Sequence, residues 1–504
     1  MNFAEAVMKI PNKLTENGAA AYDSTGQAVL DLFAQIGALR PRSEREIEMK
    51  FANAYNANPL IATKMLFYCG NIRGGLGERR TFRICLRWLA INHPHVVILN
   101  MANIYHFNRW DSYFVLIDTP VEKEMWELIA AQLEEDATTA IRVKNGDPYM
   151  SISLLAKWMP TETASSAKTR KLARKAMENL GLTPRQYRKL ISALRKYLNV
   201  TERAMSTGEW STIDYPSVPS YAMKNYRKAF ARNDAERFAA YKSSLTKGET
   251  KVNASTLYPY DLVGEVRKSG RVYDRFIHGY RYNYDTIIEE QWKALPNYVS
   301  GDNDFVIMAD VSGSMDCSGG RPMNTSIGLA TYFAQRNTGA YHNLYMTFTN
   351  EPHFVKLREG ATLADTIGQV MGTDVGYSTD LAKAFMYILE TAVTNGLKNS
   401  DMPKALVVIS DMEIDPYFRR NCSFDFVDEM KARFATYGYT LPKLVLWNVE
   451  ARNDTFLSKS DDVVLVSGQS PSVFKNLCGA LEGKTAWEFM MEVLDDPMYD
   501  CVGI

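Results

Sequence analysis

The stretch Phe305-Val306-Ile307-Met308-Ala309-Asp310-Val311-Ser312-Gly313-Ser314-Met315 decides the fold of the C-terminal half of this 504-residue chain. Five apolar residues end there in the pattern Asp-x-Ser-x-Ser. A short apolar run that meets a polar turn predicts a buried strand. Open α/β sheets bind ligands at the carboxyl ends of their strands, and hard cations prefer oxygen ligands. We therefore expect Asp310, Ser312 and Ser314 to belong to a metal site.

Two later loops complete this expected site. The first is Gly376-Tyr377-Ser378-Thr379-Asp380, and the second follows the apolar run 405–409 as Ser410-Asp411. Thr379 adds a hydroxyl oxygen, while Asp310 and Asp411 supply charge, through bound water. Because few of these ligands are anionic, a bound Mg²⁺ would stay electrophilic. It would then accept a carboxylate or another acidic oxygen from a partner.

Taken in order, the three loops resemble the metal-ion-dependent adhesion site of a von Willebrand factor A domain. The resemblance implies Mg²⁺, or another divalent cation, at a site formed by Asp310, Ser312, Ser314, Thr379 and Asp411. A lone Asp-x-Ser-x-Ser is a weak signal, because it arises by chance in Ser-rich loops. The main rival to a functional site is a vestigial one that no longer binds metal.

The rest of the C-terminal half is typical of an α/β fold. Apolar runs predict strands at 344–348, 353–357, 405–409, 444–449 and 463–466, and helical spacing predicts helices at 324–337 and 380–390. Strands separated by helices indicate a mostly parallel sheet covered on both faces. We expect a Rossmann-like von Willebrand factor A domain over residues 299–504.

The N-terminal half is predicted to be mainly helical. Apolar residues recur at helical spacing in the segments 28–36, 44–54, 59–69, 81–91, 122–133, 166–180 and 184–198. Their lengths suit paired helices stacked as degenerate, HEAT-like repeats, which we expect over residues 1–240. Residues 241–298 are polar, Tyr-rich and poorly periodic. We interpret them as the connection into the C-terminal domain.

Cysteine spacing and the apolar pattern favour a cytoplasmic protein. The six cysteines form no Cys-x-x-Cys pair, which argues against a zinc site. The residues from Met1 to Glu5 do not begin a signal peptide, and no apolar run reaches membrane-spanning length. We expect a reduced, cytoplasmic protein with no membrane partner.

The formal net charge is zero, but the charge is unevenly distributed. From Lys157 to Arg203 there are twelve Lys and Arg against three Glu, whereas from Glu450 to Ile504 four basic residues face ten acidic ones. The basic stretch is either a solvated helical face, as charge runs usually are, or a phosphate-contacting surface. Tyr187 and Tyr197 lie among the basic residues, and either pack in the core or stack on bases.

A Gly-rich loop, Arg73-Gly74-Gly75-Leu76-Gly77-Glu78-Arg79-Arg80, separates two predicted helices. Its backbone amides and arginines could cradle a phosphate. It is not a P-loop, because the Lys-Ser/Thr ending is absent. The other interpretation is a tight turn between helices, with Arg79 in a structural ion pair.

Three motifs in the N-terminal half give a second resemblance. Gly74 to Arg80, Asn108-Arg109-Trp110-Asp111, and Ser153-Leu154-Leu155-Ala156-Lys157-Trp158-Met159-Pro160 precede the metal loops in that order. With them the chain resembles the Ro ribonucleoprotein family, in which a TROVE module precedes a von Willebrand factor A domain. It looks closest to the uncharacterised bacterial, viral and plant relatives of that family.

The resemblance implies an RNA-binding scaffold. In that family the helical repeats close into a ring with the A domain, single-stranded RNA ends enter the ring, and small structured RNAs bind outside. Carried over, it makes basic residues of the helical module candidates for RNA contact. These candidates are Arg79, Lys157, Lys168, Arg170, Lys171, Arg174, Lys175, Arg185, Arg188 and Lys189.

An enzyme is not expected. The six histidines form no catalytic set. Glu413 and Asp415 lie close to the third metal loop, and we expect them to line a partner-binding rim. Two hypotheses remain: a ribonucleoprotein scaffold that binds small structured or misfolded RNA, and a metal-dependent module that captures an acidic protein ligand.

Overall fold

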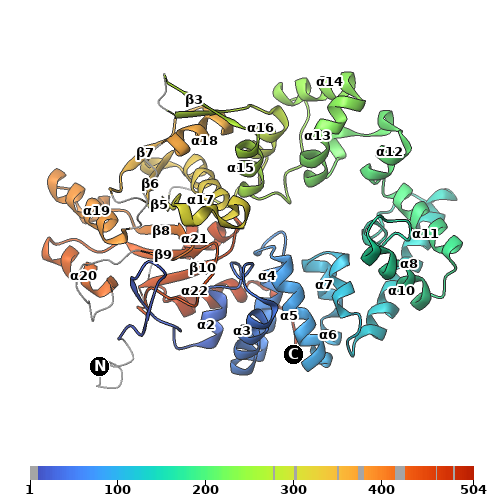
Figure 1. Cartoon of the computed structure of the whole chain (residues 1–504), viewed down its shortest axis with the longest axis horizontal. Helices are drawn as coiled ribbons and strands as arrows, with labels where there is room; N and C mark the ends of the chain where they lie inside the picture. The colour runs from blue at the N-terminus through green and yellow to red at the C-terminus, as the bar shows by residue number, and fades with distance from the viewer. Residues whose placement is uncertain are drawn as a thin grey trace. The chain divides into compact units, whose positions relative to one another are not determined.

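The computed structural model describes residues 10–275, 279–299, 303–348, 351–372, 380–414, 426–460, 462–480 and 483–504. Its contacts divide the chain into two compact units (Figure 1). The first unit is Met1–Thr81 with Ala254–Asp500, and the second is Phe82–Asn253 with Cys501–Ile504. In the described part of the chain, no helix is both long enough and apolar enough to cross a membrane.

A six-stranded sheet forms the centre of the first unit, in the order β10-β9-β8-β5-β6-β7. The strands are β5 Phe305–Ala309, β6 Leu344–Thr347, β7 Phe354–Lys356, β8 Ala405–Ser410, β9 Lys443–Asn448 and β10 Val463–Ser467. All neighbours pair in parallel except β6 and β7. The parallel-rich sheet confirms the predicted α/β character of the C-terminal half. It also makes β5 and β8 neighbours, with Ala309 opposite Ile409.

Helices cover both faces of this sheet. They are α17 Cys317–Arg336, α18 Leu363–Gly372, α19 Leu381–Asn395, α20 Phe426–Thr436, α21 Val473–Ala480 and α22 Ala486–Leu494, with short 3-10 helices η4 Gly313–Asp316, η5 Gly339–Tyr341, η6 Asn399–Asp401 and η7 Pro497–Tyr499. Residues of α19 and α20 share an apolar cluster with Val306 and Met308 of β5. On the other face, rings of α17 and α21 pack against Phe305 and Trp447. We call the sheet with these helices the sheet domain.

The N-terminal segment packs on this sheet, where a separate helical module was expected. Its elements are β1 Lys13–Leu14, β2 Ala20–Ala21, α2 Ala28–Phe33, α3 Glu44–Ala57 and α4 Pro59–Gly70. Tyr22 forms a β-bridge with Phe456, and Ser467 donates a hydrogen bond to the carbonyl of Phe33 at 3.0 Å. A Cβ atom on Gly37 would lie 2.6 Å from the Cα of Gly468, so glycine permits this close approach.

The segment 241–298, which we expected to connect to the C-terminal domain, contains several regular elements. It contains the end of α14 Ala235–Thr246, then α15 Pro259–Lys268, the hairpin β3 Arg271–Asp274 and β4 Gly279–Tyr282, and α16 Thr286–Lys293. α15 buries Leu262, Val263 and Val266. Gly328 of α17 lets the backbone of Pro259 approach closely, since an added Cβ would lie 3.0 Å from it. The apolar face of one short helix therefore adds to the cover of the sheet domain.

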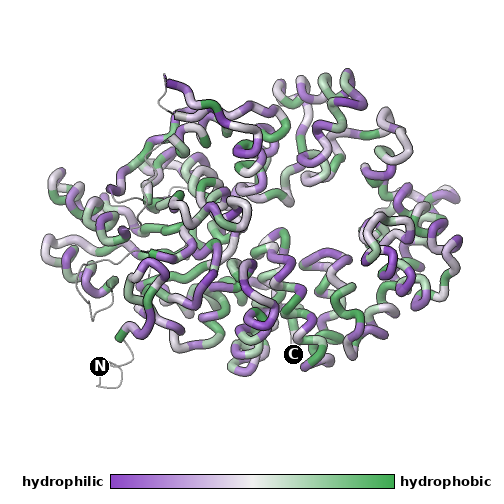
Figure 2. Tube along the Cα trace, viewed as in Figure 1, coloured by the Kyte–Doolittle hydropathy of each residue, from purple (hydrophilic) through white to green (hydrophobic). Residues whose placement is uncertain are grey.

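The second unit is helical throughout. Its elements are α5 Arg79–Asn92, α6 Pro94–Leu99, α7 Met101–Phe107, η1 Trp110–Leu116, α8 Glu122–Lys144, α9 Leu155–Trp158, α10 Ala167–Asn179, α11 Pro184–Tyr197, α12 Thr201–Thr207, η2 Trp210–Thr212, η3 Tyr215–Ser217, α13 Ser220–Asn233 and α14. Figure 2 shows hydrophobic and hydrophilic residues alternating along these helices, as amphipathic helices require. The prediction of a helical N-terminal half is confirmed, while HEAT-like repeats and the boundaries at 240 and 299 stay predictions.

Candidate metal centre and nucleic-acid interface

Asp310 lies at the carboxyl end of β5 and is completely buried. Its Oδ1 accepts a hydrogen bond from the Ser312 amide at 2.9 Å, and its Oδ2 accepts one from the Ser410 hydroxyl at 2.6 Å. The Asp310 amide donates to the carbonyl of Ile409 at 3.1 Å. Both carboxylate oxygens are therefore held in place by neighbours, an arrangement that suits a carboxylate acting on a cation through water.

The structure brings the first and third predicted loops together. The hydroxyls of Ser312 and Ser314 lie 3.0 Å apart beside Asp310. Asp411 follows β8, the strand next to β5, and only 1% of its surface is exposed. Thr379 lies outside the described residues. Among the residues that are described, no three His, Cys, Asp or Glu side chains form a metal-binding group. The described part of the site thus offers two carboxylates and two hydroxyls.

The electrostatics of this edge favour a cation. Burial first, and the Asp411 carboxylate second, raise the pKa of Asp310 to about 6. Two buried carboxylates at adjacent strand ends repel one another, and a positive charge between or beside them removes that cost. Oxygen donors of this kind suit Mg²⁺ or another hard divalent cation.

Arg452 supplies one positive charge within the chain itself. Its Nη2 lies 2.6 Å from Oδ2 of Asp411, and its Nη1 lies 3.3 Å from Oε2 of Glu16. Nearby, the fully buried Glu450 accepts a hydrogen bond from the Ser318 hydroxyl at 2.5 Å. Sequence reasoning missed both Arg452 and Glu450. The available signal was their position, because they follow the buried strand β9 as Asp310 and Asp411 follow theirs.

The prediction that Glu413 lines a partner-binding rim is wrong. Only 2% of Glu413 is exposed, because the N-terminal hairpin lies over it. Its Oε2 accepts the amide of Glu16 at 2.6 Å, and its backbone carbonyl accepts the side-chain amide of Asn17 at 2.6 Å. A segment that is distant in sequence therefore occupies this place. Asp415, the other expected rim residue, lies outside the described residues.

The backbone amides of the Gly-rich loop already donate hydrogen bonds within the protein. The amides of Arg73 and Gly74 donate to the side chain of Asn71, and those of Leu76, Gly77 and Glu78 donate to backbone carbonyls of α4 and the residue after it. A phosphate would have to displace these hydrogen bonds. Glu78 is 2% exposed and pairs with Arg40 at 2.8 Å. The contacts favour the interpretation as a tight structural turn.

Eight of the ten candidate RNA contacts lie on α10 and α11, and these eight divide into two groups. Five are exposed and form no ion pair with any residue that the structure describes: Lys168, Lys171, Arg174, Arg185 and Lys189. Others have intramolecular partners. Arg170 donates to the carbonyls of Ala164 and Ser165, Lys175 pairs with Asp118 and Glu122, and Arg188 pairs with Glu162. The sequence did not reveal this division, because Lys175 and Arg188 pair with residues that are distant in sequence.

Arg79 and Lys157 lie apart from the five. Arg79 is exposed at the start of α5 and belongs to the first unit. Lys157 is half-buried, with its Nζ 5.7 Å from the ring centre of Trp158. The guanidinium of Arg109 lies closer to the same ring, at 3.8 Å from its centre.

The two aromatic motifs of the helical half pack together. Arg109 joins the motif at Asn108 to the motif that ends in Trp158-Met159-Pro160. Arg195 donates to the carbonyls of Ala156 and Met159, and the buried Tyr187 donates to the carbonyl of Pro160 at 2.7 Å. These residues hold α9 against α11. Of the two alternatives for Tyr187, core packing and stacking on bases, the structure therefore shows core packing.

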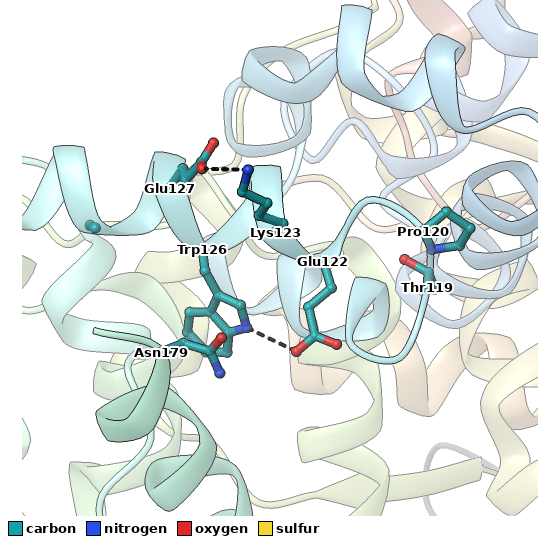
Figure 3. Close-up of a pocket in the computed structure, with 8 residues that line it drawn as sticks. Thr119, Pro120, Glu122, Lys123, Trp126, Glu127 and Asn179 are labelled. Carbon is teal, nitrogen blue, oxygen red and sulfur yellow. Dashed lines mark hydrogen bonds and ion pairs between the residues drawn. The ribbon is translucent and has the colours of Figure 1, made fainter. Parts of the chain in front are cut away.

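The second unit also contains a pocket of about 550 Å³ between the start of α8 and the end of α10 (Figure 3). Its lining includes Glu122, Glu127, Lys123, Trp126 and Asn179. In Figure 3 Glu122 accepts a hydrogen bond from the Trp126 indole, and Lys123 pairs with Glu127. Two carboxylates make this a poor site for a phosphate. None of the ten candidate RNA contacts lines it.

The chain matches two protein families. The family "Domain of unknown function (DUF2828)" matches residues 15–109 and 123–301, which together make up more than half of the chain. The chain belongs to the DUF2828 family. The family "Domain of unknown function (DUF7788)" matches residues 304–493, a range that contains all six strands of the sheet domain. Neither description states a function.

Three individual proteins are similar to this member of DUF2828. "Uncharacterized protein L728" of Acanthamoeba polyphaga mimivirus is 29% identical, over 93% of this chain and 85% of the viral protein. The Ro (RSR) protein of Deinococcus radiodurans is 15% identical with a TM-score of 0.37, over 94% of this chain and 99% of its own. Proximal thread matrix protein 1 from the mussel byssus, solved "with zinc occupied MIDAS motif", is 10% identical with a TM-score of 0.24. That match covers 36% of this chain and 48% of the mussel protein. Both TM-scores are low, and neither similarity says what this chain binds.

Proposed function

We propose that this chain is a non-catalytic, Ro-like RNA-binding scaffold whose sheet domain holds a divalent cation, with Mg²⁺ the expected ion. The observation that carries the RNA part is a set of five exposed cations on α10 and α11 that form no ion pair within the described part of the chain: Lys168, Lys171, Arg174, Arg185 and Lys189. Exposed Lys and Arg side chains can each neutralise a phosphate and release counterions. We call these residues the basic face. Small structured RNA or single-stranded RNA ends are the proposed ligands.

The size of the electrostatic effect can be estimated. If each residue of the basic face contacts one phosphate of a single strand, log Kd changes with log salt with a slope of about 3.5. Affinity then falls by roughly 100-fold between about 50 and about 200 mM salt. Such a salt dependence distinguishes phosphate binding from carboxylate capture by a metal, which depends on the ion instead.

The test is RNA binding by the full chain across a salt series, with the five residues changed to Gln. We expect weaker binding and a slope close to zero for this variant. A matched control changes five lysines of the sheet domain to Gln: Lys398, Lys404, Lys459, Lys475 and Lys484. If both variants lose affinity equally, net charge explains the binding and the basic face does not. Absence of RNA binding by the unmodified protein would refute the proposal.

A second function rests on a different observation. The Asp310 carboxylate, the Ser312 and Ser314 hydroxyls and the Asp411 carboxylate meet at one edge of the sheet. A divalent cation held there would present an open position to an acidic group of a protein ligand. In that case a chelator abolishes partner binding while salt has little effect, and Asp310→Asn has the same effect as the chelator.

A further inference from the structure

Tyr149 lies on the loop between α8 and α9, and 76% of its surface is exposed. Its ring stacks on that of Tyr197, the last residue of α11, with ring centres 5.8 Å apart and planes inclined by 5°. Tyr197 covers one face of the Tyr149 ring. The high exposure shows that the opposite face is open to solvent.

The loop holds this ring in a fixed place. The hydroxyl of Tyr197 donates to the carbonyl of Met150 at 2.5 Å. Further along, the amide and hydroxyl of Ser153 donate to the buried Asp136 at 2.9 and 2.6 Å. Before the ring, Arg142 pairs with Asp147 at 2.8 Å. An exposed ring that is anchored on both sides loses little conformational freedom when a second ring stacks on it.

The charges around this ring suit a nucleic acid. Tyr197 lies on α11, the helix that carries Arg185 and Lys189 of the basic face. Lys189 and Lys196 are separated by seven residues, so they project from nearly the same side of the helix, and both are exposed. Asp147, the acidic residue nearest to Tyr149 in the loop, is already paired with Arg142. A single exposed tyrosine needs no explanation, but an anchored ring that stacks on a residue of a basic helix does.

We propose that the open face of Tyr149 stacks on an unpaired nucleobase, while Lys189 and Lys196 contact the phosphates of the same single strand. Every base has a flat face that can stack on an aromatic ring, so this site is tolerant of sequence. A base inside a duplex is already stacked on its neighbours and cannot use it. The inference rests on the proposed RNA-binding function and names single-stranded nucleic acid as the ligand of this part of the surface.

The test compares a short fluorescent single-stranded oligoadenylate with a blunt RNA duplex, each titrated with the full chain. We expect Tyr149→Ala to weaken single-strand binding roughly 10-fold, within the range found when a stacking aromatic is removed. Duplex binding and the salt dependence should not change, because no charge is lost. Tyr149→Phe should bind like the unmodified chain, and Tyr149→Leu should bind like the Ala variant, because a leucine has no π-face.

Tyr437→Ala is the matched control, since Tyr437 is 59% exposed and lies just after α20 in the other unit. Tyr149→Ala should leave the unfolding temperature unchanged, which separates lost stacking from lost structure. The stacking site is refuted if the Ala variant binds single strands as well as the unmodified chain does, or if single-strand and duplex binding fall together. If the unmodified chain binds neither RNA, the proposed function itself fails.

Discussion

Replacing Arg452 with Met tests whether a positive charge is needed at the carboxyl edge of the sheet. The change removes the guanidinium that lies 2.6 Å from Oδ2 of Asp411, a side chain that is 1% exposed. It leaves the apolar part of the side chain largely in place. Asp411 is then a buried carboxylate without its ion-pair partner, beside the buried Asp310.

The expected loss of stability follows from burial. Breaking a buried ion pair costs about 3–5 kcal/mol, because the remaining charge stays desolvated. The Arg452 side chain is 26% exposed, so water screens part of its charge and the lower end of that range, about 3 kcal/mol, is expected. For a unit of this size, that loss lowers the unfolding temperature by roughly 4 °C. Mg²⁺ should restore much of it in the variant, because the unpaired carboxylate attracts the cation more strongly.

The assay is calorimetric unfolding with Mg²⁺ or with a chelator. Arg433→Met is the control: Arg433 forms an ion pair of 2.7 Å with Glu429, but the two side chains are 42% and 30% exposed. Exposed pairs of this kind contribute about 0–1 kcal/mol. The reasoning fails if Arg452→Met is no more destabilising than Arg433→Met. It also fails if the gain from Mg²⁺ is the same in the Arg452 variant and in the unmodified chain.

Two further predictions concern the first unit. Glu289 accepts a hydrogen bond from the Leu363 amide at 2.8 Å, and burial raises the pKa of its carboxyl group. Because an unfolded glutamate has a pKa of about 4.3, the folded state loses stability relative to the unfolded state as the pH rises above that value. Glu289→Gln should raise the unfolding temperature at about pH 7 and not at about pH 4, and equal shifts at both would contradict this. The second prediction compares Gly77 with Gly396, which both have left-handed φ angles, +63° and +59°. A Cβ atom added to Gly77 would lie 1.9 Å from the Tyr258 hydroxyl, whereas a Cβ atom added to Gly396 would have no atom within 4 Å. Gly77→Ala should therefore cost about 2 kcal/mol more than Gly396→Ala in thermal unfolding, and an equal cost would show that the loop is loosely packed.

The sequence by itself determined the strands of the sheet and several of the helices. Apolar runs such as 305–309 and 405–409 became the neighbouring strands β5 and β8, because a fully apolar strand must be covered on both faces. Asp310 and Asp411 lie at the same edge of the sheet because the carboxyl ends of adjacent parallel strands lie there. Helical periodicity likewise predicted both ends of α10 and α11 to within one residue, since amphipathic spacing is a local property.

Only the tertiary structure decided which side chains are free to act. Lys171 and Lys175 look alike in sequence, but Lys175 pairs with Asp118 and Glu122, which lie more than fifty residues earlier. Arg452 likewise finds Asp411, and Glu413 is buried by Glu16, through chain reversals that no local pattern encodes. Electrostatic and stacking partners are set by distance in space, so the basic face and the Tyr149–Tyr197 pair emerge only once the chain has folded.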